Sequence, residues 1–365
     1  MSANEKLRIG IIGCGGIANG KHMPSLKVFD NEVEMVAFCD MIEERAQKAA
    51  KEYGAANAAV YTDYRKLLED KTIDVVHVCT PNRSHAEISI AALEAGKHVM
   101  CEKPMAKTAA DAHLMIEAAR KSGKKLTIGY QHRHKPASTY LKQVIGRGDL
   151  GEIYYAKALA IRRRGTPNLG VFLNEYEQGG GPLIDIGTHS LDLTLFLMDN
   201  YKPHMVVGTK YKKITNPDSG NPWGPWDVHE HTLEDAAFGF IVMENGATIS
   251  LEATWALNIA TPIAEGSVIL CGDKAGAQIM PDGVNINKDE FGRLIDTVPN
   301  LEARGVAFYN GVRETAQITE ARRWIEAIKN DTDPLVLPEQ ACVVSEILEA
   351  IYVSAASGKP FYFER

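Results

Sequence analysis

The stretch Glu102-Lys103-Pro104 places a lysine where it could act on a bound ligand. It follows an apolar run, residues 97–101, that is typical of a buried strand. Proline fixes its own φ at about −65° and keeps the residue before it extended, so we expect one backbone state for Lys103 at the end of this strand. In doubly wound sheets, ligands bind at this edge of the strands. A lysine ammonium held there could stabilise a developing negative charge or exchange a proton.

Asp185 and His189 are a second pair of candidates for chemistry. They are four residues apart, so on a helix their side chains are neighbours on one face. Pro182 suits the first position of that helix, and the glycines at 179–181 let the chain pass close to a ligand. The unperturbed pKa of histidine is about 6.5, which suits the transfer of a hydroxyl proton near neutral pH.

A glycine turn near the N-terminus predicts a dinucleotide site. The pattern Gly13-x-Gly15-x-x-Ala18 lets the backbone approach a pyrophosphate, which then meets the N–H groups at a helix start. Asp40 ends the next apolar run, about 20 residues further on, where a carboxylate binds ribose hydroxyls and repels a 2′-phosphate. NAD is therefore favoured over NADP. The expected cofactor contacts are Gly13, Gly15, Gly16, Ile17, Asp40, Thr80, Pro81, Asn82, His85, Glu102 and Lys103.

The elements that must position these residues alternate over the first 130 residues. Strand-like runs at 7–12, 33–39, 73–79, 97–101 and 125–129 alternate with helical patterns such as 43–53 and 108–122. Strands separated by single helices indicate a parallel sheet covered on both faces. Pro24 is expected to break or restart the first helix. Ser84 and Glu87 are expected to form a capping box at the start of a later helix.

Beyond residue 130 the pattern changes to strands joined by hairpins, with Glu244-Asn245-Gly246 as one turn signal. Strand-like runs occur at 153–161, 205–211, 236–243, 248–255 and 267–271, and helical patterns at 136–145, 182–198, 314–329 and 342–356. Hairpin-linked strands favour an antiparallel sheet with helices over one face. The predicted fold class is α/β, with domains at 1–130 and 131–365.

A length of 365 residues suggests two domains.

Composition and charge exclude several kinds of partner. The net charge of −7 gives no basic surface for nucleic acid or an anionic membrane. We expect no membrane span and no secretory signal, because no long apolar run is present. Six cysteines without CxxC spacing indicate a reduced, cytoplasmic protein, and no spacing fixes a metal site, so none is expected.

Taken together, these motifs resemble the Gfo/Idh/MocA oxidoreductases, a family that includes glucose–fructose oxidoreductase and inositol dehydrogenase. The glycine turn, Asp40, Thr80-Pro81-Asn82-x-x-His85 and Glu102-Lys103-Pro104 occur in the family's order, and residues 179–189 are similar to its second-domain signature. The resemblance covers essentially the whole chain. It implies an N-terminal Rossmann domain and a C-terminal α/β domain whose open, mostly antiparallel sheet commonly serves as a subunit interface. A homodimer or homotetramer is therefore expected.

The resemblance also implies NAD(P)-dependent oxidation or reduction of a sugar or cyclitol hydroxyl, and it carries catalytic roles to Lys103, Asp185 and His189. We assign proton transfer to His189 and stabilisation of the reacting oxygen to Lys103, although these two roles could be exchanged. Asp185 would bind a neighbouring hydroxyl or orient the lysine. His132 and Arg163 are further candidates for substrate contact.

Three functions are compatible with these residues. The first is an NAD-dependent sugar or cyclitol dehydrogenase. The second is a glycoside-cleaving enzyme in which NAD transiently oxidises the sugar. The third, a non-catalytic NAD or sugar sensor, has no need of both Lys103 and His189. The substrate, the reacting carbon and the physiological direction are not determined by the sequence.

Overall fold

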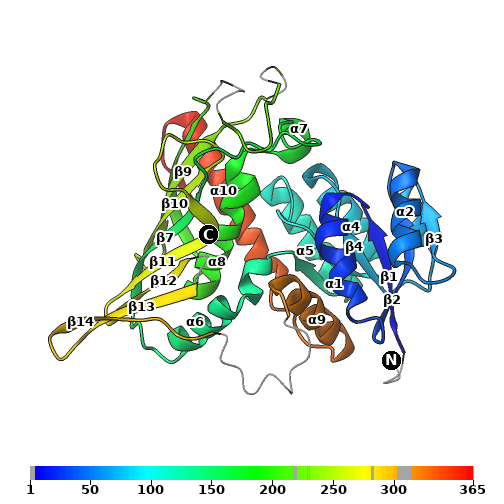
Figure 1. The fold of residues 1–365 in the computed structure, drawn as a ribbon, viewed down its shortest axis with the longest axis horizontal. Helices are drawn as coiled ribbons and strands as arrows, with labels where there is room; N and C mark the ends of the chain where they lie inside the picture. Colours follow the sequence, from blue (N-terminus) through cyan, green and yellow to red (C-terminus); the bar gives the residue numbers. More distant parts are fainter. Residues whose placement is uncertain are drawn as a thin grey trace. The chain divides into compact units, whose positions relative to one another are not determined.

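The computed structural model describes residues 5–214, 216, 220–227, 229, 231–280, 283–301 and 314–364 (Figure 1). The chain forms two compact units. The first unit contains Met1–His134 and Glu314–Cys342, and the second contains Lys135–Arg313 and Val343–Arg365. The sequence interpretation placed a single boundary after residue 130 and assigned 314–342 to the second domain, whereas the structure groups these residues with the first unit.

The first unit is built on a six-stranded parallel sheet. Its strands are β1 (Leu7–Ile12), β2 (Val33–Cys39), β3 (Ala59–Tyr61), β4 (Val75–Val78), β5 (His98–Cys101) and β6 (Leu126–Ile128). The order β3-β2-β1-β4-β5-β6 is that of the Rossmann fold, in which the crevice for a dinucleotide opens where the order reverses, between β1 and β4. The predicted fold of this part is confirmed.

The helices of the first unit pack next to the sheet, and most of them alternate with its strands along the chain (Figure 1). They are α1 (Met23–Lys27), α2 (Glu43–Tyr53), α3 (Tyr64–Glu69), α4 (His85–Glu94), α5 (Ala109–Ser122) and α9 (Ala316–Lys329), with short turns η1 (Ala18–His22), η2 (Asn82–Ser84) and η3 (Gln131–His134). The helix expected to break or restart at Pro24 is not broken there, because the π-helical turn η1 passes directly into α1 and His22 keeps helical φ and ψ; α1 begins next to Pro24, which lies in its first turn. Helix α9 packs against α1 and η1, where Trp324 and Ile325 join the core.

The capping box predicted at Ser84 is wrong. The turn η2 runs directly into α4, so Ser84 has helical φ and ψ, whereas a capping residue needs a non-helical backbone. Its hydroxyl donates to the Pro81 carbonyl instead. The Glu87 carboxylate accepts hydrogen bonds from Tyr64 and Arg65 on α3.

The second unit is built on a nine-stranded mixed sheet. Its strands are β7 (Ile153–Ile161), β8 (Pro203–Tyr211), β9 (Ala236–Met243), β10 (Thr248–Thr254), β11 (Ile263–Gly272), β12 (Ala275–Met280), β13 (Gly283–Glu290), β14 (Arg293–Thr297) and β15 (Phe361–Tyr362). The order is β14-β13-β12-β11-β7-β10-β9-β8-β15, and of these pairs only β7 with β10 is parallel. The expected open, mostly antiparallel sheet is therefore confirmed.

Helices and short helical turns accompany this sheet. They are α6 (Pro136–Gly146), α7 (Glu175–Gln178), η4 (Leu183–Gly187), α8 (Thr188–Met198) and α10 (Pro338–Ser357), the last of which begins in the first unit. Helix α8 packs on β7 and β11. Among the described residues, no helix is long and apolar enough to cross a membrane.

Helix α10 packs close to β8 and β9, and both strands have glycine beneath it. A Cβ atom added at Gly208 would lie 2.3 Å from the Ile351 carbonyl oxygen, and one at Gly239 would lie 2.6 Å from the Ile351 side chain. Any side chain at these positions would push the helix away from the sheet.

We expect Gly208→Ala to lower the free energy of unfolding by about 1–3 kcal/mol through overpacking against α10, as measured by urea unfolding. Gly146→Ala is a matched control, because a Cβ there, at the end of α6, meets no described atom within 4 Å. This control should leave stability unchanged or slightly raised. Equal unfolding midpoints for Gly208→Ala and the unsubstituted protein would contradict the close packing.

Candidate active site

The glycine turn after β1 has the geometry that a dinucleotide requires. Gly13 has φ of 89°, and a Cβ there would lie 2.6 Å from the Cys79 carbonyl oxygen, so both the backbone and the space demand glycine. A Cβ at Gly15 or Gly16 would meet no described atom within 4 Å. The turn is therefore tight on the sheet side and open on the other, which fits the close approach of a pyrophosphate.

Asp40 lies at the carboxyl end of β2 and is tied to the glycine turn. Its Oδ2 accepts the Cys14 N–H at 2.9 Å, and its Oδ1 accepts the Ile42 N–H at 2.9 Å. Each carboxylate oxygen has a further lone pair, so Asp40 can still accept from ribose hydroxyls. Its following neighbour, Met41, is largely exposed and brings no positive charge for a 2′-phosphate.

Glu102 is buried at the end of β5 and uses both carboxylate oxygens inside the protein. Its Oε1 accepts from Lys21 Nζ at 2.7 Å and from His22 Nε2 at 2.8 Å. Its Oε2 accepts the main-chain N–H of Lys103 at 3.1 Å. The Glu102 side chain, which we expected at the cofactor, thus holds the backbone of the half-buried Lys103.

Further buried charges surround Glu102. Lys21 also pairs with Glu320 of α9 at 2.9 Å, and His22 Nδ1 lies 2.9 Å from His77 Nδ1. Burial opposes charge on Glu102, but Lys21 and then His22 outweigh it and hold the pKa of that carboxyl well below its usual range. Burial raises the pKa of Glu320 despite Lys21, and it lowers the pKa of His77 well below its usual value.

His85 is fully buried and connects the end of β4 to the lysine motif. Its Nδ1 lies 2.8 Å from the Pro104 carbonyl oxygen and its Nε2 lies 2.9 Å from that of Thr80. Burial lowers the pKa of His85, and the two carbonyls oppose this shift. The ring therefore contacts the backbone of two expected site segments, and its assignment as a cofactor contact stays a prediction.

In the second unit, Asp185 and His189 come from one continuous helical segment. Asp185 lies in the π-helical turn η4 and buried His189 in the first turn of α8. A π-turn closes i→i+5 hydrogen bonds and so contains one more residue than an α-helical turn, and it is frequent at functional sites. The Asp185 Oδ2 accepts the indole N–H of Trp255 at 3.0 Å, and Trp255 is fully buried. This bond fixes the orientation of the Asp185 carboxylate.

The glycine turn that precedes η4 is held by a buried carboxylate. Glu234 Oε1 accepts the Gly181 N–H at 2.9 Å and the Tyr352 hydroxyl at 2.6 Å. A Cβ at Gly180 would lie 2.1 Å from the Tyr352 oxygen, so the turn has no room for a side chain. Glu234 and Tyr352 thereby fix where the helical segment with Asp185 begins.

The weaker substrate candidates differ in exposure. His132 is buried in η3 of the first unit. Arg163 follows β7 with an exposed side chain, and its carbonyl accepts the Leu257 N–H at 3.1 Å. Its neighbour Arg162 lies 3.4 Å from Glu265 and over the ring of Trp223. The structure thus gathers the nucleotide candidates at the carboxyl ends of β1, β2, β4 and β5, and groups Asp185 with His189 separately.

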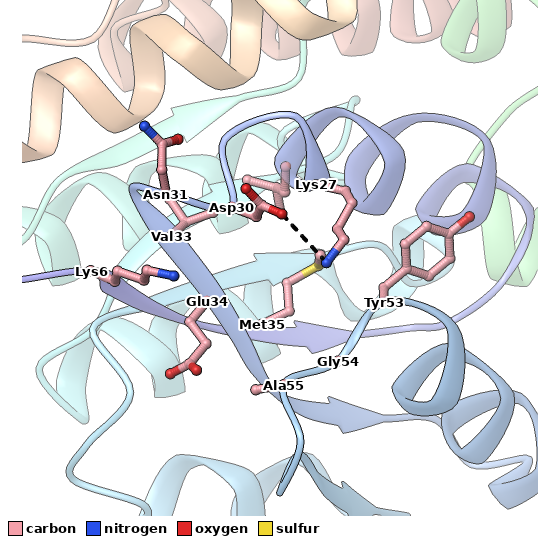
Figure 2. A pocket seen from close by; sticks show the side chains of 11 residues that line it. Lys6, Lys27, Asp30, Asn31, Val33, Glu34, Met35, Tyr53, Gly54 and Ala55 are labelled. Atoms are coloured by element: carbon pink, nitrogen blue, oxygen red, sulfur yellow. Dashed lines mark ion pairs between the residues drawn. The ribbon is translucent and has the colours of Figure 1, made fainter.

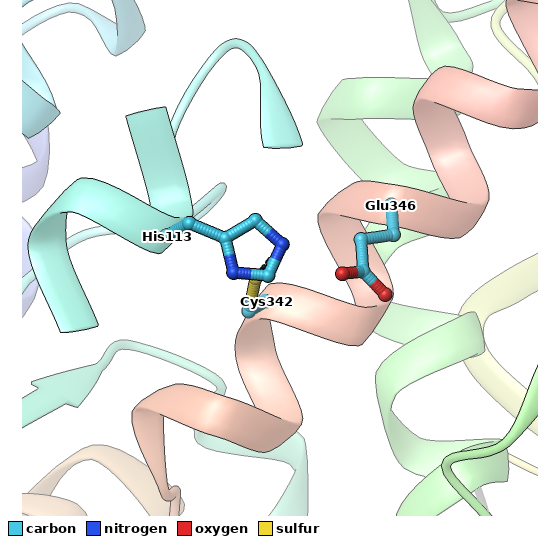
Figure 3. Close-up of side chains that lie close together, drawn as sticks. All are labelled: His113, Cys342 and Glu346. Atoms are coloured by element: carbon cyan, nitrogen blue, oxygen red, sulfur yellow. Dashed lines mark hydrogen bonds between the residues drawn. The ribbon is translucent and has the colours of Figure 1, made fainter. Parts of the chain in front are cut away.

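Two other features lie away from these residues. An open pocket, lined by Lys27, Met35, Tyr53 and neighbours, lies at the amino end of β2, opposite the edge with the glycine turn (Figure 2). Cys342 Sγ lies 3.8 Å from both ring nitrogens of His113, and Figure 3 shows these two side chains next to each other. These are residue types that can bind a metal, and the expectation of no metal stays a prediction.

Comparison with known proteins decides the family. Residues 7–130 match the model of an oxidoreductase family with an NAD-binding Rossmann fold, and residues 142–363 match the C-terminal α/β domain of the same family. The chain belongs to the Gfo/Idh/MocA oxidoreductases. It is an NAD-binding oxidoreductase of the class that acts on CH–OH groups.

Several relatives of this Gfo/Idh/MocA protein have named activities. The D-glucoside 3-dehydrogenase of Escherichia coli (strain K12) is 38% identical over 359 residues, which is 97% of each chain. The levoglucosan dehydrogenase of Pseudarthrobacter phenanthrenivorans is 30% identical over 271 residues, 68% of each chain. A solved structure of levoglucosan dehydrogenase with NADH has a TM-score of 0.83 at 23% identity, covering 99% of this chain and 100% of that one, which shows the shared fold.

Sequence reasoning missed the buried partners of the site, namely Lys21, Glu320, Trp255 and Glu234. One of them carried a signal. Glu320 lies four and eight residues before Trp324 and Ile328, so it falls on the apolar face of α9, where an unpaired carboxylate is costly. A charge in that position indicates a buried partner, but not which one.

Buried histidines make the stability of this protein sensitive to acid. Burial lowers the pKa of His134 to about 3. The unfolded state therefore binds a proton below a pH of about 6.5 that the folded state does not, and stability is lost as the pH falls. When the pH is lowered from 7.5 to 5, the free energy of unfolding of the unsubstituted protein should fall by about 2 kcal/mol more than that of His134→Phe. Urea unfolding at both values tests this, with exposed His229→Phe as the control. A pH-independent difference would show that His134 is not buried in its neutral form.

Proposed function

We propose that this enzyme oxidises a secondary hydroxyl of a sugar, sugar derivative or cyclitol, with Lys103 and His189 at the proton-transfer centre. The observation that carries the proposal is the 38% identity to a D-glucoside 3-dehydrogenase over 97% of both chains. It favours glucosides, and their C3 hydroxyl, among the substrates. The buried supports of Lys103 and Asp185 agree with it, because a catalytic group has to be held in place.

Three side chains divide the proposed chemistry. His189 takes the hydroxyl proton, and the Lys103 ammonium donates a hydrogen bond to the same oxygen and stabilises the charge that develops on it. Asp185, oriented by the Trp255 indole, accepts a hydrogen bond from a neighbouring hydroxyl. His132 and Arg163 are proposed to contact the rest of the substrate. Lys103 and His189 can exchange their roles, and the pH dependence of their variants distinguishes the two assignments.

The glycine turn after β1 indicates which residues bind the cofactor. We propose that the N–H groups at Gly15, Gly16 and Ile17 hold the pyrophosphate and that Asp40 binds the ribose. Bound NAD supplies the hydride acceptor of the reaction. Thr80, Pro81 and Asn82, at the end of β4, are proposed to bound the nicotinamide side of the site.

Lys103→Ala and His189→Ala should each lower kcat by about 10²–10⁴-fold, the range for loss of a proton-transfer group. NADH binding, followed by fluorescence, should persist because neither residue holds the pyrophosphate. Lys121→Ala, an exposed change on α5, is the control and should retain activity. Near-normal turnover in both site variants would refute the assignment.

A glycoside-cleaving activity by transient oxidation is the second candidate, and the glucoside in the relative's name favours testing it. Absorbance at 340 nm with NAD⁺ is followed against glucosides, free hexoses, inositols and anhydrosugars. Accumulation of NADH supports the dehydrogenase. Release of the aglycone without NADH accumulation supports cleavage. A sensor would do neither while still binding NADH.

We also propose that the protein is a homodimer or homotetramer through its C-terminal sheet, in the cytoplasm. Val207 and Phe240 face each other on β8 and β9, and both side chains are partly exposed. Burying such apolar pairs against a second sheet would stabilise an assembly.

Phe240→Glu should shift the protein toward a smaller species in analytical ultracentrifugation, because a charge would have to be buried in the assembly. Leu114→Glu, an exposed apolar residue on α5, is the matched control and should leave the assembly unchanged. An unaltered sedimentation profile for Phe240→Glu would place the interface elsewhere.

A further inference from the structure

A cluster of buried charged and polar side chains adjoins the backbone of Lys103 in the first unit. Its members are at most 4% exposed and come from four elements. They are Lys21 and His22 from η1, His77 from β4, Glu102 after β5 and Glu320 from α9. The proposed chemistry above uses none of their side chains.

The ammonium group of Lys21 is the centre of this cluster. It donates to Glu102 Oε1 at 2.7 Å, lies 2.9 Å from Glu320 Oε2 and donates to the Gly129 carbonyl oxygen at 3.4 Å. A lysine ammonium has three N–H donors, and here each has an acceptor. Burial alone would lower the Lys21 pKa, but Glu102 and Glu320 outweigh this and raise it above its usual value. Lys21 is therefore charged and fixed in position.

The Glu102 carboxylate connects Lys21 to the main chain of Lys103. Glu102 Oε1 is held by Lys21 and His22, which fixes the plane of the carboxylate, and Oε2 then accepts the Lys103 N–H at 3.1 Å. On the other side of Lys103, the His85 Nδ1 lies 2.8 Å from the Pro104 carbonyl oxygen. Buried side chains thus contact the main chain at Lys103 and at the residue that follows it.

Stability alone does not account for such a cluster. Buried ion pairs lose hydration, and apolar residues of similar volume often give equal or greater stability. What the charged cluster provides, and an apolar one would not, is a fixed acceptor for one particular N–H group. That group belongs to the residue proposed to touch the reacting oxygen.

We propose that Lys21 is a positioning residue for Lys103, acting through the Glu102 carboxylate, with Glu320 as the second anion that holds Lys21 in place. This inference rests on the proposed function in one respect, namely that Lys103 acts on the substrate. The hydrogen-bonded connection itself is independent of that function.

The test compares the full-length protein with Lys21→Met in two measurements. Hydrogen exchange, followed by mass spectrometry of a peptide that contains Lys103, should become about 3- to 10-fold faster at this amide, as expected for loss of one hydrogen bond. The kcat with the sugar substrate should fall roughly 10- to 100-fold, with NADH affinity close to that of the unsubstituted protein. Lys27→Met, on the exposed side of α1, is the control and should change neither.

A second variant covers the case in which Lys21→Met leaves buried carboxylates without a counterion and fails to fold. Lys21→Met/Glu102→Gln/Glu320→Gln removes all three charges together, so it should fold with stability similar to that of the unsubstituted protein. A purely structural cluster predicts normal kcat in this folded variant. Positioning predicts the same roughly 10- to 100-fold loss.

Each outcome decides one question. Unchanged exchange at Lys103, or unchanged kcat in a folded variant, overturns the positioning role. If the unsubstituted protein oxidises no sugar in the panel, the proposed function fails, and faster exchange at Lys103 in Lys21→Met still supports the connection from Lys21 to Lys103.

Discussion

The carboxylate of Glu102 is the interaction on which the first unit's site depends. One of its oxygens binds Lys21 and His22, from the turn that follows the glycine loop, and the other binds the Lys103 N–H. Through Lys21 it also engages Glu320 of α9. The nucleotide turn, the lysine motif and a helix from near the end of the chain are thereby held together by one buried anion. Moving any one of them would leave a charge without its partner.

In the second unit, neutral N–H groups rather than an ammonium group donate the hydrogen bonds that fix the position of the site residues. The Trp255 indole orients the Asp185 carboxylate, and Glu234 holds the Gly181 N–H where the helical segment begins. In both units a residue proposed to bind the substrate, Lys103 or Asp185, is hydrogen-bonded to a side chain that is almost fully buried, Glu102 or Trp255. A hydrogen bond to a buried partner holds the polar group of the site residue in one orientation.

Local patterns in the sequence were enough for much of the fold. The strand at Ile153–Ile161 and five of the six strands of the first unit follow from periodicity and punctuation, whereas β3 and α3 were missed. Strands β13 and β14 were missed because the last four residues of β13 are polar and exposed, and β14 is mostly exposed at the edge of the sheet, so little apolar alternation marks them. Motif residues such as Lys103 could be named. Buried supports such as Lys21 and Glu320 could not, because they meet Glu102 only through tertiary structure.

The inclusion of α9 in the first unit has a consequence for how the chain is made. Glu320 and Trp324 complete the charge cluster and the core of a sheet whose strands are all finished by Ile128. During synthesis the strands of the nucleotide-binding unit therefore emerge early, but Lys21 lacks its second counterion, Glu320, and α1 lacks its apolar cover until α9 has been translated. A fragment that ends before α9 would therefore lack part of the core of this unit and one partner of Lys21.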